Sequence, residues 1–195
     1  SRFIHNLPDP AKIVAPTECP RCDFSLVQEG AFIKCNNIHC PARLERRILY
    51  WCRKLEMDGI GEKLAEQLCS SGLVSDIADL YRLKDRKTEL LSLERMAEKS
   101  ANNILDELEN SKSMTLVTFI SALGLPRIGP EIATLVCSEV NSLDELIQMS
   151  LSREEAIERL VKIDRIGDVV AGLLLDGISS RRESILDLHA QIEIT

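Results

Sequence analysis

Two glycines separated by one apolar residue lead into a helix-forming run in the segment Leu55-Glu56-Met57-Asp58-Gly59-Ile60-Gly61-Glu62-Lys63-Leu64-Ala65. This pattern predicts a tight turn between two helices, because glycine adopts backbone conformations that a Cβ obstructs. The second helix begins near Glu62, and its first backbone N–H groups have no partner within the helix. Together with the helix dipole, they form a site for an anion such as phosphate. An ordinary glycine-containing connection between helices is the competing interpretation.

The same turn recurs three more times along the chain, which indicates an internal repeat. The aligned positions lie 36, 32 and 38 residues apart, at Gly61, Ala97, Gly129 and Gly167. A small residue four positions later lets two helices cross closely, and each copy has one: Ala65, Ala101, Ala133 and Ala171. An arginine replaces the first glycine in the last three copies, as Arg95, Arg127 and Arg165. These arginines either supply charge beside an anion or face solvent.

The composition favours packed helices in one domain or two small ones. Of the 195 residues, 45% are hydrophobic but only 4% are aromatic, which suits a core of Leu, Ile, Val and Ala. The longest apolar runs are much shorter than the ~20 residues that cross a membrane. We therefore expect a soluble, intracellular protein.

The net charge of −7 is unevenly distributed. Residues 1–54 contain 9 basic and 5 acidic side chains, whereas residues 55–195 contain 15 and 26. Nucleic-acid affinity usually depends on basic surface, so the acidic helical part is the main objection to a nucleic-acid partner. The objection is met if backbone amides and a few placed arginines make the contacts.

Four cysteines near the N-terminus have the spacing of a zinc site: Cys19, Cys22, Cys35 and Cys40. Two short knuckles of this kind place four thiolates around one Zn²⁺ and hold a segment too small for its own core. Because all four positions are then protein ligands, the metal is structural. Disulfides are the alternative for the cysteines, and His39 is an alternative ligand. Cys52, Cys69 and Cys137 lack partner spacing and are interpreted as small core residues.

These signals divide the chain into three parts. Residues 1–16 are a linker or the tail of a preceding domain, residues 17–42 are the zinc finger, and residues 43–195 are a helical domain with turns near 55–65, 91–101, 123–133 and 161–171. A helix that starts at Pro41 combines an apolar stripe with basic residues, which either meet phosphate or are solvated. Further helices are predicted from Glu62 to an end at Gly72, over Glu98–Lys112, and from Pro130 onward. Ser142 with Glu145, and Ser152 with Glu155, have capping-box spacing at two helix starts. The last two predicted helices are Asp168–Leu175, which Gly177 interrupts, and Ser180–His189.

The order of these features resembles the C-terminal part of the bacterial-type NAD⁺-dependent DNA ligases, over residues 16–190. In that family a four-cysteine zinc finger precedes four helix-hairpin-helix motifs. The matching segments are Cys40-Pro41-Ala42, Met57-Asp58-Gly59-Ile60-Gly61-Glu62-Lys63, Gly72-Leu73-Val74, Ala78-Asp79-Leu80-Tyr81, Leu93-Glu94-Arg95, Glu98-Lys99-Ser100-Ala101 and Ala122-Leu123-Gly124. Cys35 and Cys40 are slightly closer together than the family pattern, and Ala97 replaces its usual glycine.

The resemblance implies the DNA-clamping part of a ligase that seals nicks in replication and repair, in the bacterial cytoplasm at the nucleoid. No Lys-x-Asp-Gly motif occurs in the chain, so NAD⁺ would act only through an absent adenylation domain, and no catalytic residue is expected here. The implied partners are nicked duplex DNA and the adenylation and OB domains of a parent chain, of which this chain is a fragment or a stand-alone relative. The implied DNA-binding residues are Gly59, Gly61, Lys63, Arg95, Arg127, Gly129, Arg165 and Gly167.

Two other functions are alternatives to DNA binding. A non-enzymatic helical scaffold that binds a protein partner would fit the acidic charge and the lost glycines. Catalysis by this chain alone is disfavoured, because its histidines, at His5, His39 and His189, are not paired with a nucleophile by any motif.

Overall fold

The computed structural model describes residues 15–37 and 40–195. The chain forms two compact units, which divide between Cys40 and Pro41. Each unit is described by itself below.

The first unit contains a small antiparallel hairpin of β1 (Leu26–Glu29) and β2 (Phe32–Cys35). Gly30 has a φ of 60° in the two-residue connection, a conformation that suits glycine. The larger apolar side chains of this unit remain exposed: Phe24, Val27, Phe32 and Ile33. With its apolar side chains at the surface, the unit cannot depend on a hydrophobic core of its own.

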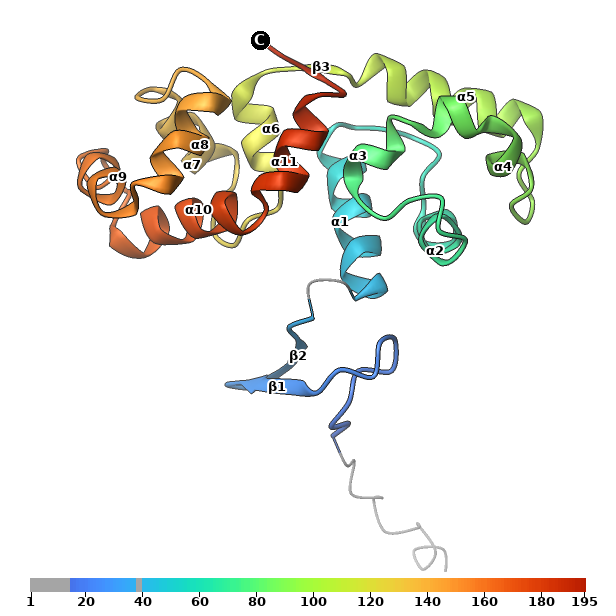
Figure 1. Cartoon of the computed structure of the whole chain (residues 1–195), viewed down its shortest axis with the longest axis horizontal. Coiled ribbons are helices and arrows are strands. Elements are labelled where there is room, and N and C mark those ends of the chain that lie inside the picture. The colour runs from blue at the N-terminus through green and yellow to red at the C-terminus, as the bar shows by residue number, and fades with distance from the viewer. Residues whose placement is uncertain (1–14, 38–39) are drawn as a thin grey trace, which may run out of the picture. The chain divides into compact units, whose positions relative to one another are not determined.

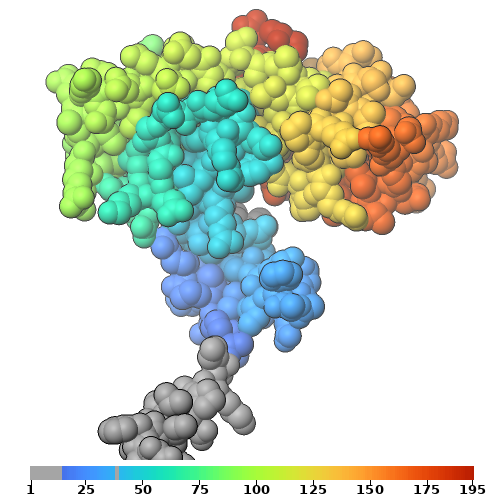
Figure 2. Space-filling model, turned by 180° about the vertical axis from the view of Figure 1, so that it is seen from behind, coloured from blue at the N-terminus to red at the C-terminus, as the bar shows by residue number. Residues whose placement is uncertain are grey.

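The second unit is built from helices, as the sequence predicted. Four helical hairpins follow one another: α1 (Pro41–Lys54) with α2 (Glu62–Ser70), α4 (Lys87–Leu91) with α5 (Glu98–Asn110), α6 (Leu116–Ala122) with α7 (Pro130–Cys137), and α9 (Arg153–Leu160) with α10 (Asp168–Ser180). The connecting elements are α3 (Ile77–Leu80), the 3₁₀ helix η1 (Leu83–Arg86), α8 (Leu143–Leu151), α11 (Arg182–His189), and the paired strands β3 (Ser113–Met114) and β4 (Glu193–Ile194). Figure 2 shows the first two hairpins in cyan and green beside the last two in yellow and orange.

The core joins the first half of this unit to the second. Trp51 on α1 is fully buried, donates from Nε1 to the Tyr81 hydroxyl at 3.0 Å, and meets the Phe119 ring of α6 edge-on at 5.9 Å between centroids. The four alanines of the repeat are also fully buried, which agrees with close helix crossing: Ala65, Ala101, Ala133 and Ala171. Both halves therefore share one hydrophobic interior.

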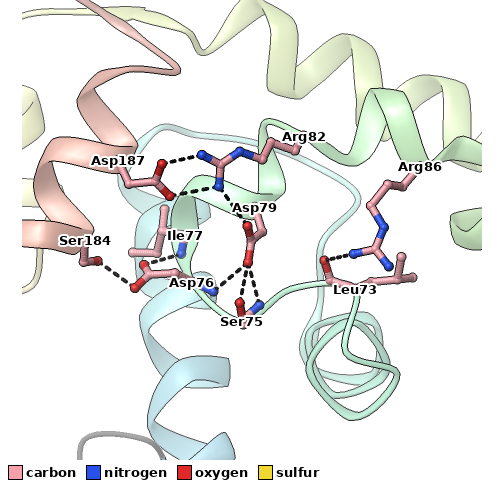
Figure 3. Close-up of polar contacts among 9 residues, drawn as sticks. All are labelled: Leu73, Ser75, Asp76, Ile77, Asp79, Arg82, Arg86, Ser184 and Asp187. Atoms are coloured by element: carbon pink, nitrogen blue, oxygen red, sulfur yellow. Dashed lines mark hydrogen bonds and ion pairs between the residues drawn. The ribbon is translucent and has the colours of Figure 1, made fainter.

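A polar network fastens α11 to α3 (Figure 3). Arg82 bonds to both Asp79 and Asp187, with Nη1 at 3.0 Å and 2.9 Å from the two carboxylates. The Ser184 hydroxyl of α11 donates to Asp76, which caps α3 in a capping box with Asp79. In Figure 1, α11 lies beside α3 accordingly. This network holds the last helix, α11, against α3 in the first half of the helical unit.

Two local predictions differ from the structure, and one element was not predicted. Gly177 does not interrupt a helix, since α10 continues to Ser180 and Gly177 packs its backbone against Leu125, where a Cβ would lie 2.7 Å from Cδ2. The Ser152 side chain makes no N-cap hydrogen bond to α9. Ser152 is also the C-cap of α8, where its backbone has a ψ of 62°. The parallel pair of β3 and β4 has no local sequence signal, because its strands are distant along the chain.

Candidate metal centre and candidate nucleic-acid interface

The four N-terminal cysteines converge on one point. All four Sγ atoms lie within 4.8 Å of one another, with 3.8 Å between Cys19 and Cys40 and 3.6 Å between Cys22 and Cys35. Four sulfurs around a tetrahedral ion at Zn–S distances of ~2.3 Å would be about 3.8 Å apart. The donor set therefore fits one tetrahedral metal ion with no open position. His39, the alternative ligand, lies outside the described residues.

Local hydrogen bonds prepare one of these thiols for metal binding. Residues 19–24 form a tight knuckle in which the Asp23 N–H donates to the Cys19 carbonyl at 2.8 Å and Asp23 itself has a φ of 54°. The Phe24 backbone lowers the pKa of Cys22 to about 7 through a hydrogen bond. Desolvation raises the pKa of Cys35, so this thiol gives up its proton chiefly when a metal binds.

The remaining cysteines belong to the helical unit. Cys52 is buried, and burial raises its pKa to about 12, which makes it an unreactive core thiol. Cys69 and Cys137 are partly buried against the same core.

The four repeat turns share one backbone conformation. The position two residues before each aligned site is left-handed, with φ values of 91° at Gly59, 62° at Arg95, 64° at Arg127 and 67° at Arg165. A residue with a side chain pays about 1–3 kcal/mol for this conformation. Three arginines nevertheless adopt it, so the packing of the two helices imposes the turn even where the glycine is lost.

The aligned residues themselves are helix N-caps with ordinary extended backbone. Their φ values lie between −82° and −97°, and none of the four caps α2, α5, α7 or α10 through a side chain. A Cβ added at Gly61, Gly129 or Gly167 would meet nothing within 4 Å. Neither conformation nor internal packing therefore requires glycine there. The absence of a side chain instead leaves the free amides in the first turns of α2, α7 and α10 open to an external group. In α7 these amides begin at Glu131, because Pro130 has no N–H.

The charges around the four turns are unequal. Lys63 of the first turn and Arg127 of the third are exposed and make no ion pair within the described residues. Arg95 lies 3.5 Å from its neighbour Glu94. Arg165 of the fourth turn pairs with Glu131, which sits in the first turn of α7 beside the third. The first and third turns thus present unpaired cations, whereas the arginines of the other two are engaged.

Acidic residues also stand at the starts of these helices. Each first turn contains one: Glu62, Glu98, Glu131 and Asp168. A carboxylate there is favourable for the helix dipole but competes with a bound anion. The candidate site predicted from the sequence contains glycines and basic residues and omits these acids. The recurrence of an acid one or two residues after each cap was the signal that would have found them.

Comparison with known proteins agrees with this architecture. Residues 55–110 and 119–180 match the family described as SAM-like helix-hairpin-helix tandem. The DNA ligase of Clostridium novyi is 40% identical over 167 residues, covering 84% of this chain and 24% of that protein. The DNA ligase of Sulfurovum sp. is 36% identical over 190 residues, covering 96% and 28%, and that of Methylacidiphilum infernorum is 40% identical over 162 residues, covering 82% and 22%.

The chain spans about a quarter of the length of these relatives. Across the described residues, every helix is too short or too polar to traverse a bilayer. The match in sequence, the two pairs of hairpins and the four-cysteine cluster fit the C-terminal part of a bacterial DNA ligase. The chain belongs to the SAM-like helix-hairpin-helix tandem family.

Proposed function

We propose that this chain binds duplex DNA through its sugar-phosphate backbone, without reading bases, as the DNA-clamping part of an NAD⁺-dependent DNA ligase. The observation that carries the proposal is the set of three glycine N-caps that neither backbone conformation nor internal packing requires. Main-chain amides at these caps suit phosphate oxygens, and the missing side chain lets the phosphate approach closely. Such contacts are the same for every base sequence.

The first and third turns make the strongest contacts in this proposal. Amides after Gly61 and Gly129 take phosphate oxygens, while Lys63 and Arg127 supply positive charge. The fourth turn, at Gly167, contributes amides, and Arg165 contributes charge only when it leaves Glu131. Ala97 and the Arg95–Glu94 pair make the second turn the weakest of the four.

The rest of the assembly follows from the ligase relatives. Zn²⁺ bound by the four cysteines folds the first unit and takes no part in chemistry. The adenylation domain of the parent chain uses NAD⁺ and joins the nick, beside an OB domain, during replication and repair. The partner is nicked duplex DNA in the bacterial cytoplasm, at the nucleoid. The names of the relatives support the ligase assignment alone. The assignments of NAD⁺, the nick, the other domains and the cellular setting rest on the resemblance of residues 16–190 to the NAD⁺-dependent ligases.

Ion pairs within the helical unit use one cation for each acid and leave its acidic surplus unchanged, so the proposal depends on backbone amides and a few placed cations at the turns. Asp187 pairs with Arg82, Asp176 with Arg153, and Glu145 with Arg159. If about four phosphates are neutralised, the log–log salt slope should be near −3.6, and affinity should fall about a hundredfold between 50 and 200 mM salt.

The test compares the metal-loaded chain with a Gly61→Val/Gly129→Val variant, using fluorescence anisotropy on nicked and intact duplexes. Because both sites have extended backbone and open space, the variant should keep its helical circular dichroism and its unfolding temperature while losing at least tenfold in DNA affinity. Ala190→Val is a matched control, since Ala190 is an exposed cap at a helix end that presents carbonyls rather than amides. No binding by the parent chain at low salt, or equal affinity of the folded double variant, would overturn the proposal in favour of a protein-binding scaffold.

A further inference from the structure

Helix α1 carries a basic face that the four turns do not account for. At 100° per residue, its five basic residues and Tyr50 fall within a sector of about 120°. These basic residues are Arg43, Arg46, Arg47, Arg53 and Lys54. Its only acid, Glu45, lies outside this sector. The opposite face holds Ile48, Trp51 and Cys52 in the core. The basic face is therefore a surface feature, separate from the packing of the helix.

Few acids neutralise this face. Arg43 and Arg46 make no hydrogen bond or ion pair within the described residues. Arg47 reaches Asp76 with Nη2 at 3.2 Å, but its Nε is buried without a partner. Arg53 and Lys54 lie over the Tyr50 ring, at 5.8 Å and 5.5 Å from its centroid. Within residues 15–37 and 40–195, the Asp76 carboxylate is the one that pairs with this face.

Arg181 adds a further positive charge from α11's N-terminal end. Its Nη1 donates to the Leu123 carbonyl at 2.9 Å, which fixes the guanidinium. Desolvation lowers the pKa of Arg181, and repulsion from Arg47 and Arg43 lowers it further. The Ser184 hydroxyl, one turn along α11 from Arg181, lies 3.5 Å from Arg47 Nη2, so Arg181 stands near the α1 arginines. Asp76 partly offsets their repulsion, and an anion would stabilise the arrangement further.

The face runs between the two turns that carry unpaired cations. At its end, Lys54 is followed directly by the first turn, residues 55–61. Near its middle, the Tyr50 ring packs on Gly124 at the start of the third turn, where a Cβ would lie 3.1 Å from the ring. From Arg43 to Lys54 the helix is about 16 Å long, which equals the rise of roughly five base pairs. The length and position both suit a stretch of phosphate backbone.

We infer that the basic face of α1, together with Arg181, is a second phosphate-binding surface for the duplex that the first and third turns hold. This inference rests on the proposed function. An acidic peptide would also be attracted by the charge, but the amide sites at both adjoining turns favour a phosphate track that continues across all three surfaces.

The test is the variant Arg43→Gln/Arg46→Gln, which removes two side chains that have no hydrogen-bond or ion-pair partner among the described residues and should leave the unfolding temperature unchanged. Two lost phosphate contacts should make the salt slope of duplex binding shallower by about 1.8, so that the loss of affinity between 50 and 200 mM salt becomes about 12-fold smaller. The matched control is Lys84→Gln/Lys112→Gln, which changes the net charge equally beside Glu109, away from α1. The control should keep the parent slope.

The outcomes separate the two proposals. If the parent chain binds duplex DNA and loses affinity in Gly61→Val/Gly129→Val, but Arg43→Gln/Arg46→Gln keeps the parent slope, the α1 surface is wrong and the proposed function stands. An equal change of slope in the lysine control would also overturn the α1 surface, because the effect would then depend only on net charge. If the parent chain binds no DNA at all, the proposed function and the inference fail together. A polyglutamate peptide that competes as well as DNA of equal charge would assign the face to an acidic protein instead.

Discussion

Replacing Glu131 with glutamine should strengthen DNA binding, because it releases Arg165. The two side chains pair across the third and fourth hairpins and are 69% and 66% exposed. An ion pair this exposed contributes at most about 1 kcal/mol to stability, so its loss should hardly affect folding. At the interface, however, the substitution removes a negative charge beside the N-terminus of α7. It also frees a guanidinium that is held next to another glycine cap.

The size of the effect follows from counterion release. One additional phosphate contact makes the log–log salt slope steeper by about 0.9. If the two proteins bind equally at 1 M salt, this contact raises the affinity of the variant about 15-fold at 50 mM salt and about fourfold at 200 mM. The gain is therefore largest at low salt.

Fluorescence anisotropy on a nicked duplex across this salt range measures both quantities. The control is Asp176→Asn, which breaks a comparably exposed pair with Arg153 at the other end of α9 and changes the charge equally. A second variant, Glu131→Gln/Arg165→Gln, should lose the gain. The reasoning is refuted if Glu131→Gln leaves the slope unchanged, or if the double variant binds as tightly as the single one.

Three further predictions concern stability and metal. Phe119→Ala should lower the free energy of unfolding by about 3–5 kcal/mol in one transition for the whole helical unit, measured with urea, whereas the exposed Val169→Ala should change it by at most about 0.5 kcal/mol. Chelation of the metal should expose residues 15–40 to protease and leave the helical circular dichroism intact, because binding worth about 10–16 kcal/mol folds that unit; unchanged protection would contradict the structural role. Desolvation opposes ionisation of Asp79, but hydrogen bonds from Ser75 and Arg82 outweigh it and lower its pKa. Its stabilisation is therefore present above about pH 4 and lost as pH falls through the lowered value, and Asp79→Asn should flatten this part of the urea-midpoint profile.

The sequence by itself determined the features that arise within a few residues or from strict repetition. Helix starts at Glu62, Pro130 and Asp168 were predictable because caps and first turns have local signals. The buried alanines followed from their fixed place in each repeat. The cysteine spacing predicted the cluster, since a knuckle is closed by its own backbone hydrogen bonds.

Only the tertiary structure decided which of these local units are free to bind and which are engaged. The pairing of Arg165 with Glu131 joins residues from different hairpins, and the placing of Arg181 beside α1 depends on the network that returns α11 to α3. Position 177 requires glycine because a Cβ there would lie 2.7 Å from Cδ2 of Leu125, in another hairpin. Local sequence sets backbone preference over one or two turns, whereas these contacts depend on how distant segments pack around the shared core.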